Sequence, residues 1–323
     1  MVSTFVRHGG SVGSPRCVKQ ETRSLLRRFG MSRACPDERT RRLATSRRNV
    51  LGRMYSPSVN RPVPAKVLRA FGVDSPRPLS GGQGTSWRAG DLVLKPEGGP
   101  AYEWLAHELR NLQPDGVRIS APVPTVDGEW VCDGWSAKQW VEGSHPDFRQ
   151  PSTWSDIIQA GRAFHRMVRH LPRPDSLTTR TGPWATADRV AWGEQPSDLR
   201  QEFAEVARLL QHASRPLGPS QIVHGDLTGN VLFAPGAPPA VIDISPYWRP
   251  PEYAEGVVIA DALCWHGASA SVLQEVGVPV TAVARALLFR LATTNELLLA
   301  GLATVDPDAE AEKYRRAASL IGL

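Results

Sequence analysis

The sequence predicts an α+β protein with two unequal lobes, a small β-rich lobe followed by a larger, mainly helical one. Between residues 61 and 140, short β-type runs alternate with glycine-containing turns and include one helical segment. From Ser152 onward, apolar residues recur mainly with helical spacing. The chain has 323 residues and 41% hydrophobic content, which is enough to give both lobes a core. We place the lobes at residues 61–140 and 141–323.

The first 60 residues differ in composition from the rest of the chain. They carry 13 of the 38 basic residues and only 3 of the 32 acidic ones, so the remainder is mildly acidic although the whole chain has a net charge of +6. We expect residues 1–60 to form a basic, disordered tail. A transit peptide or a nucleic-acid-binding arm is the alternative for this tail. No nucleic-acid partner is expected for the rest of the chain.

Cysteines and long apolar runs give no sign of a metal site, a secretory signal or a membrane span. The four cysteines lie far apart and form no pair with metal-ligand spacing. No uncharged run of about 18 residues occurs, and no apolar run of signal-peptide type follows the N-terminus. We therefore expect a cytoplasmic protein without a membrane partner. The sequence leaves the oligomeric state open.

The small lobe is predicted to contain a β-sheet and one long helix. Its glycine-rich strand and the strand that ends at Lys95 are expected to form a hairpin. The expected helices are 66–71 and 101–112, and the expected strands are 79–87, 91–95, 117–119, 129–132 and 135–141. A break at 143–146 ends this section and precedes the helical lobe.

The large lobe is predicted to be helical except for a cluster of strands near residues 222–244. Helical spacing of apolar residues supports the first two of its helices, and residues 172–198, rich in Pro, Thr and Gly, are expected to be an irregular excursion. The expected helices are 154–171, 199–210, 260–265, 280–301 and a surface helix at 309–320.

The most informative stretch is Ile222-Val-His-Gly-Asp-Leu-Thr-Gly-Asn-Val-Leu-Phe233, followed by Val241-Ile-Asp-Ile244. It predicts a strand, a short polar loop with Asp226 and Asn230, a second strand, and a third strand that ends at Asp243. Two carboxylates and an amide are thus expected to meet. Phosphoryl transfer from a magnesium nucleotide needs a carboxylate that accepts the proton of the attacking hydroxyl and oxygen ligands that hold the metal.

Taken in order, these features resemble the aminoglycoside phosphotransferase and choline kinase branch of the protein-kinase-like fold. The features are a glycine-rich hairpin, a strand lysine, a helix glutamate, a hinge, the motif His224-Gly-Asp-Leu227 and the pair Ile242-Asp243. The resemblance covers about residues 64–323. The chain is also similar to an actinobacterial group of such phosphotransferase-like proteins. The resemblance implies a bilobal protein-kinase-like fold, with ATP and Mg as cofactors.

The resemblance also implies roles for residues of the large lobe. Asp226 is the expected catalytic base, which agrees with the chemistry of a carboxylate in this loop. His224 is expected to brace the loop rather than to react. Asp243 and Asn230 are expected to hold magnesium. An ionised Asp243 at the end of an apolar strand is costly unless it meets a cation, and this supports a metal-binding role.

In the small lobe the expected site is a nucleotide-binding one. Lys95 ends an apolar strand, so it needs a partner, and we expect it to contact the α- and β-phosphates and a helix carboxylate. Glu108 is the preferred carboxylate and Glu103 the alternative. The remaining expected contacts are phosphate binding by Gly81, Gly82 and Gly84, and adenine binding by the backbone of Gln139 and Val141.

One feature departs from the family pattern. The family places five positions between the base and the asparagine, whereas Asp226 and Asn230 are four apart. Either Asn230 reaches the metal through a tighter loop, or the second metal position is altered. An ordinary turn residue is a further interpretation of Asn230.

The predicted function is therefore ATP-dependent phosphoryl transfer to a hydroxyl of a small molecule. The alternative is a nucleotide-binding pseudokinase that acts as a sensor. The acceptor stays open: a polycationic antibiotic would require several acidic residues along the large lobe, but solvated helix faces explain such residues equally well. The acidic residues available for that purpose are Glu194, Asp198, Glu202, Glu205, Glu252, Glu255 and Asp261.

Overall fold

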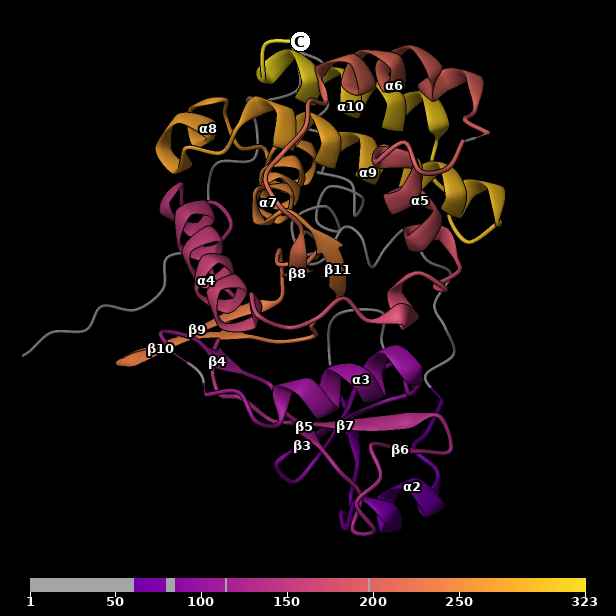
Figure 1. Ribbon diagram of the computed structural model, residues 1–323, viewed down its shortest axis with the longest axis vertical. Helices are drawn as coiled ribbons and strands as arrows, with labels where there is room; N and C mark the ends of the chain where they lie inside the picture. Colours follow the sequence, from indigo (N-terminus) through magenta and orange to yellow (C-terminus); the bar gives the residue numbers. More distant parts are fainter. Residues whose placement is uncertain (1–60, 80–84, 114, 197) are drawn as a thin grey trace, which may run out of the picture. The chain divides into compact units, whose positions relative to one another are not determined.

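The computed structural model describes residues 61–79, 85–113, 115–196 and 198–323 (Figure 1). The predicted tail at 1–60 and the glycines at positions 81, 82 and 84 lie outside the described residues. The fold is α+β, with a β-sheet in the N-terminal part of the described chain and mostly helices in the C-terminal part, as the sequence predicts.

The N-terminal part is an antiparallel sheet of six short strands. Their order is β1-β2-β3-β7-β5, with β6 pairing the other end of β7. At its centre β3 pairs β7 in a register that places Leu94 opposite Ala137 and Lys95 opposite Ser136. The strands are β1 (Arg77–Pro78), β2 (Trp87–Ala89), β3 (Leu92–Lys95), β5 (Pro122–Val123), β6 (Val131–Cys132) and β7 (Trp135–Gln139).

The two faces of this sheet have different chemistry, because successive side chains of a strand point to opposite faces. One face carries Leu94 and Ala137, which form a buried cluster with Val67 of helix α2 (Ala65–Ala70). The opposite face carries Lys95 and Lys138. Helix α3 (Pro100–Leu109) lies on the side of the sheet away from α2 (Figure 1). The sheet thus has an apolar face packed on α2 and a cationic face whose lysines contact Asp243.

Two smaller sheets belong to the C-terminal part. The first contains β4 (Arg118–Ile119), β10 (Ala237–Val241) and β9 (Val231–Ala234), and the second pairs β8 (Gln221–His224) with β11 (Pro246–Arg249). The strand expected at 117–119 was therefore assigned to the wrong sheet, since β4 runs parallel to β10. Strand β11 was not predicted at all.

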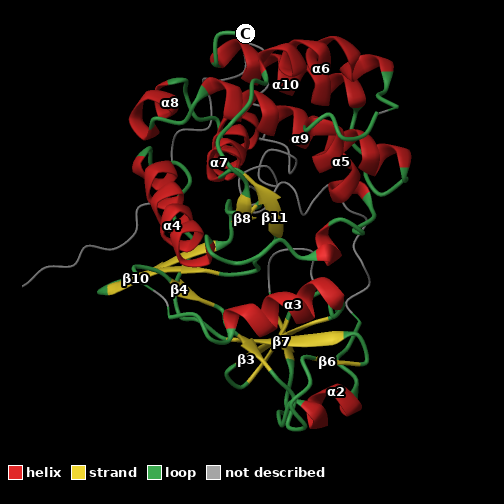
Figure 2. Cartoon of the chain, in the orientation of Figure 1, coloured by secondary structure: helices red, strands yellow, loops and turns green. Residues whose placement is uncertain are grey.

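Helices make up most of the C-terminal part, and β8 and β11 lie beside α7 (Figure 2). The helix α5 falls inside the segment 172–198 that was expected to be irregular, so that expectation was wrong. Helix α7 begins nine residues before the expected helix at 260–265. The helices are α4 (Ser152–Val168), α5 (Pro183–Ala191), α6 (Gln201–Ala213), α7 (Pro251–Trp265), α8 (Ser271–Val276), α9 (Val280–Leu299) and α10 (Pro307–Leu320).

Helices α7 and α9 form the centre of the C-terminal core. Both are buried along almost their whole length, and their apolar residues belong to one large cluster with α4, α5, α6 and α10. A helix that is apolar on every side has to be surrounded by other elements. Buried charged residues of these two helices, among them Asp261 and Arg290, therefore need partners within the protein. None of the helices in the described part of the chain combines the length and apolar character needed to cross a membrane.

Candidate active site

His224 fixes the start of the loop 225–230, which follows β8 and carries Asp226. The Asp226 backbone N–H donates to His224 Nδ1 at 3.1 Å, and His224 Nε2 donates to the Ile242 carbonyl at 3.1 Å. Burial lowers the pKa of His224, so the ring stays neutral and one nitrogen can accept while the other donates. The His224 ring thus braces the loop by binding backbone groups of Asp226 and Ile242, as the sequence predicts.

The remainder of the loop is a tight turn made possible by two glycines. A Cβ on Gly225 would lie 2.4 Å from the Tyr247 ring, so only glycine fits there without a shift. Gly229 has a φ of +82°, a conformation that favours glycine. The Asn230 N–H donates to the Leu227 carbonyl at 2.9 Å, and Asn230 Nδ2 donates to the Asp226 carbonyl at 2.6 Å. The short loop therefore closes on itself and keeps Asn230 next to Asp226.

Asp243 lies two residues beyond the end of β10 and contacts both lysines of the small sheet. Its Oδ2 is 2.6 Å from Lys95 Nζ, and its Oδ1 is 3.5 Å from Lys138 Nζ. Burial alone would raise the pKa of Asp243, but the two lysines outweigh burial and hold that pKa below its usual value. Asp243 has a φ of +48°, a left-handed conformation that Asp tolerates better than most residues.

Lys138 and Glu97 complete a cluster of two cations and two carboxylates. Glu97, just after β3, forms an ion pair with Lys138 and lies 3.8 Å from Lys95. Burial would lower the pKa of Lys138, but Glu97 and Asp243 raise it well above the usual value. Lys138 is therefore a buried, charged lysine. The sequence missed it, although a lone cation within an apolar strand was the signal that identified Lys95.

The predicted pair between Lys95 and Glu108 is not formed. The carboxylates within 4.0 Å of Lys95 among the described residues are Asp243 and Glu97, so the alternative Glu103 is excluded as well. Glu108 instead lies 3.8 Å from His107. The buried face of α3 consists of Tyr102, Leu105, Ala106 and Leu109. Tyr102 is the polar member of that face, and its hydroxyl donates to the Ala137 carbonyl at 2.8 Å.

Asp226 is anchored to the helical core by Arg290. Arg290 Nη2 donates to Asp226 Oδ1 at 2.7 Å, and the same guanidinium holds Asp261 through two hydrogen bonds of 2.8 and 2.7 Å. Arg290 is only 2% exposed, whereas the Asp226 side chain is 37% exposed. The network therefore connects α7, α9 and the loop that carries Asp226, and it gives Asp261 a structural role. Arg290 itself was missed, although it interrupts an apolar helical run.

The predicted adenine contacts differ between the two hinge residues. The Gln139 N–H donates to the Ala121 carbonyl at 2.7 Å, and its carbonyl accepts from Ser120 Oγ at 2.6 Å. Both backbone groups of Gln139 thus already have protein partners, and adenine binding at Gln139 stays a prediction. The Val141 N–H makes no hydrogen bond with another described residue.

One cavity of about 450 Å³ contains four of the ten residues selected from the sequence. Glu108, Gln139 and Val141 do not line it, and the three glycines fall outside the described residues. Thr85, the first described residue after those glycines, does line it. The predicted residues on its wall are Lys95, Asp226, Asn230 and Asp243, and the residues missed by the sequence are Glu97, Lys138, Arg180 and Arg290.

The donor set in the cavity suits a hard cation that is also bound by phosphates. Asp243 supplies carboxylate oxygens, and the Asn230 side-chain oxygen accepts no hydrogen bond from another described residue. Within the described ranges, no group of three or more His, Cys, Asp or Glu residues forms a complete metal cage. Magnesium in phosphoryl-transfer sites is commonly held by one or two carboxylates together with the substrate phosphates, so this sparse set fits.

Comparison with known proteins gives a family match over the same region. The model of the phosphotransferase enzyme family matches residues 77–244, which is more than half of the chain. An aminoglycoside phosphotransferase from Alicyclobacillus acidocaldarius has a similar structure, with a TM-score of 0.55 and 14% identity over 82% of this chain and 95% of that one. No curated protein sequence matches.

Two further structures are similar at a lower level. A thermostable mutant of aminoglycoside phosphotransferase APH(4)-Ia, solved as a ternary complex with AMP-PNP and hygromycin B, has a TM-score of 0.48 and 14% identity, covering 79% of this chain and 96% of that one. Choline kinase LicA from Streptococcus pneumoniae has a TM-score of 0.45 and 13% identity, covering 77% of this chain and 94% of that one.

Proposed function

The chain belongs to the phosphotransferase enzyme family, and from this premise we propose that it transfers the γ-phosphoryl group of ATP to a hydroxyl of a small molecule. The observation that carries the proposal is the common cavity that contains Lys95, Asp226, Asn230 and Asp243. These side chains supply a proton acceptor, a phosphate-binding cation and metal-binding oxygens within reach of one substrate. Catalysis by such a set depends on positioning and on charge neutralisation.

Asp226 is the proposed base. Arg290 fixes its Oδ1, while its Oδ2 accepts no hydrogen bond from another described residue and stays available for the proton of an acceptor hydroxyl. A carboxylate held by a buried guanidinium loses little further freedom when a substrate binds. The hydrogen bond from the Asp226 backbone N–H to His224 Nδ1 fixes the same residue from its other side.

Lys95 and Lys138 are the proposed phosphate-binding cations, and Asp243 with Asn230 the proposed magnesium ligands. A magnesium ion bound there would neutralise charge on the nucleotide phosphates. Asp243 now contacts both lysines. We propose that phosphate oxygens replace Asp243 as partners of the lysines when the nucleotide binds, so that the carboxylate becomes available to the metal. The N–H of Val141, which has no partner among the described residues, and the glycines at 81, 82 and 84 remain the proposed contacts for adenine and phosphate.

Asp243→Asn tests the proposal, because it removes the carboxylate charge and keeps a residue that tolerates a positive φ. We expect magnesium to tighten ATP binding to the wild type, measured by calorimetry, and to lose most of this effect in the variant. ADP release stimulated by a panel of hydroxylated compounds should fall in parallel. Asp156→Asn, an exposed change on α4, is the matched control. Equal magnesium dependence in the wild type and Asp243→Asn would exclude the proposed metal site.

The pseudokinase alternative gives a different result in the same experiment. It predicts that ATP binds while no member of the acceptor panel, and no water, receives the phosphoryl group. Measurable ADP release that requires magnesium excludes this alternative. Intact binding without any turnover would favour it over the enzyme.

A further inference from the structure

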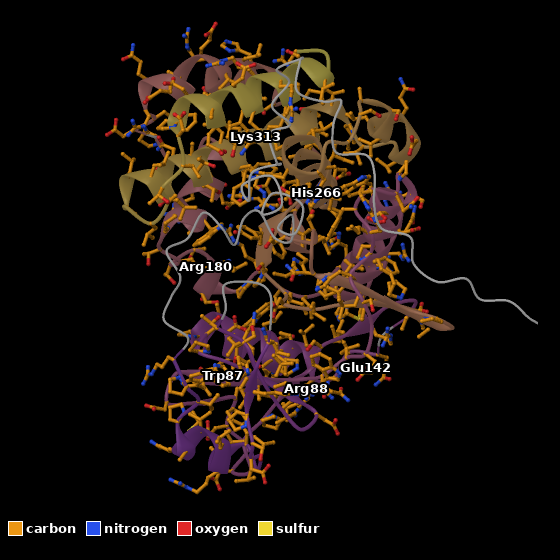
Figure 3. All side chains as sticks on the ribbon, turned by 180° about the vertical axis from the view of Figure 1, so that it is seen from behind. Trp87, Arg88, Glu142, Arg180, His266 and Lys313 are labelled. Carbon is orange, nitrogen blue, oxygen red and sulfur yellow. The ribbon has the colours of Figure 1, made fainter. Side chains whose placement is uncertain are left out.

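A second, smaller cavity adjoins the catalytic one. Its volume is about 150 Å³, and the walls of the two cavities share Arg180, Pro246 and Tyr247. Arg180 is labelled in Figure 3, where it comes from the segment between α4 and α5. Because the larger cavity contains Asp226, a molecule whose hydroxyl lies near Asp226 can extend another group past Arg180 into the smaller one.

Arg180 is held in place by uncharged groups. Its Nη1 donates to the Pro246 carbonyl at 2.8 Å, its guanidinium lies 5.2 Å from the centre of the Tyr247 ring, and its own carbonyl accepts from Arg189 Nη1 at 3.0 Å. No carboxylate among the described residues lies within 4.0 Å of it. A half-buried guanidinium that is positioned but lacks an anionic partner is suited to bind an anion from a ligand.

The acidic residues of the smaller cavity are not ion-pair partners of Arg180, because another arginine binds them. Arg249 holds Asp188 through bonds of 3.1 and 2.7 Å, and it holds Glu194 through bonds of 2.5 and 2.8 Å. The other arginines on the cavity wall, Arg173 and Arg189, form no ion pair within the described part of the chain. The smaller cavity is therefore cationic overall.

The acidic wall that a polycationic acceptor would need is not formed. Of the seven acidic residues considered from the sequence, Glu194 is the one that lines either cavity. Two others are paired elsewhere: Glu255 is buried against Arg162, and Asp261 is buried against Arg290. In the larger cavity, Tyr247 and Phe289 supply aromatic surface near Arg180 and Arg290. Together the walls of the two cavities carry seven Lys or Arg residues and five Asp or Glu residues, so they favour an anion over a polycation.

We propose that the phosphoryl acceptor carries an anionic group, a carboxylate or a phosphate ester, which binds Arg180 in the smaller cavity while its hydroxyl lies at Asp226. This inference rests on the proposed function for the position of the hydroxyl. The anion-binding role of Arg180 can be tested without any turnover. Arg180 then selects the acceptor class, and aminoglycosides are excluded from that class by charge.

The first test measures anion binding with inorganic phosphate as the probe. Phosphate should raise the Tm of the wild type above that in chloride of equal ionic strength, and Arg180→Gln should lose a large part of this increase. Lys95→Gln shows how much of the Tm increase comes from phosphate bound at Lys95 rather than at Arg180. Arg180→Lys, which keeps the charge, should retain part of the Tm increase. Arg169→Gln, an exposed change at the end of α4, is the control. No increase in the wild type, or an equal increase in Arg180→Gln, overturns the proposal.

The second test compares acceptors that differ in charge. Gluconate is compared with glucose, glycerol 3-phosphate with glycerol, and kanamycin represents polycations. We expect the anionic member of a pair to stimulate ADP release more than its neutral partner, and Arg180→Gln to reduce this preference about 10-fold to 100-fold by raising KM, as loss of a charge-assisted hydrogen bond does. Phosphorylation of kanamycin, or a preference unchanged in Arg180→Gln, contradicts the proposal. If phosphate binding depends on Arg180 but no compound is phosphorylated, the proposed function fails and the anion site stands.

Discussion

Lys95 and Lys138 show how two residues on one sheet face can serve the same site. The register of β3 and β7 places them as diagonal neighbours, and both contact Asp243 from the small sheet. The sequence identified Lys95 because a cation ends an apolar strand there. Lys138 lies in the strand Trp135-Ser-Ala-Lys-Gln139, which has fewer apolar residues than Leu92-Val-Leu-Lys95, so the same signal is weaker there. Its burial became evident only from the structure.

At the residue scale we expect Lys138→Met to weaken ATP binding. Removal of one charge-assisted contact to the phosphates should raise KM for ATP by about 10-fold to 100-fold. Steady-state kinetics at saturating magnesium measures this change, with Lys66→Met, an exposed change on α2, as the control. A KM unchanged from the wild type would show that Lys138 serves the local ion-pair cluster only.

At the scale of elements, Arg290 connects two core helices to the catalytic loop. We expect Arg290→Met to lower the free energy of unfolding by about 3–5 kcal/mol, because it leaves the buried Asp261 without its cation. Burial already raises the pKa of Asp261 although Arg290 opposes that shift. Urea denaturation measures the change, with the exposed Arg316→Met on α10 as the control. A second change, Asp261→Asn, should restore part of the loss, and failure to do so would contradict a buried charge pair.

The elements that the sequence predicted well are those whose pattern is local. Helices α4 and α6 follow from apolar spacing, and β3 and β7 follow from short β-type runs. Strand β4 was assigned to the wrong sheet because its partner, β10, lies more than 100 residues away and local sequence does not encode pairing. Helix α5 was missed within a Pro- and Gly-rich segment, although Gly182-Pro183 is a typical helix start.

In the candidate site, too, some contacts could be predicted from local sequence and others could not. Asp226, Asn230 and Asp243 lie in one motif-rich stretch, so their proximity was predictable. The partner of Lys95 was not, because Glu108 was chosen from helical spacing alone, while Glu97 and Asp243 come from a strand end and a distant loop. Arg180 lies in an irregular segment without any periodic signal, and its position depends on β11, which was not predicted.

At the scale of the whole molecule, two buried histidines make stability depend on pH. Burial lowers the pKa of His165 to about 3 and also lowers that of His224. The unfolded chain takes up protons at these rings near pH 6.5, whereas the folded protein does not, so the free energy of unfolding falls as the pH decreases from about 6.5 toward 3. The contribution of these two neutral histidines to the free energy of unfolding is fully present above pH 6.5.

His165→Gln tests the histidine contribution, because glutamine keeps an acceptor for the His224 N–H that His165 Nε2 binds at 3.1 Å. Urea denaturation at a series of pH values should show a shallower fall in stability between pH 6.5 and 4 than in the wild type. His170→Gln, an exposed change next to α4, is the control. If the free energy of unfolding falls with decreasing pH as steeply as in the wild type, His165 does not contribute to this pH dependence.

The central claim is that the Asp226 carboxylate accepts the proton of the acceptor hydroxyl in a cavity that binds magnesium ATP. Asp226→Asn keeps the size of the side chain and removes its basicity. ATP binding and ADP release should be measured on the same preparations, with Asp156→Asn as the control. The account predicts that Asp226→Asn binds ATP about as tightly as the wild type and loses turnover by about 10²-fold to 10⁴-fold. Turnover within a factor of about two of the wild type would contradict it, since a loss of that size is below any general-base contribution.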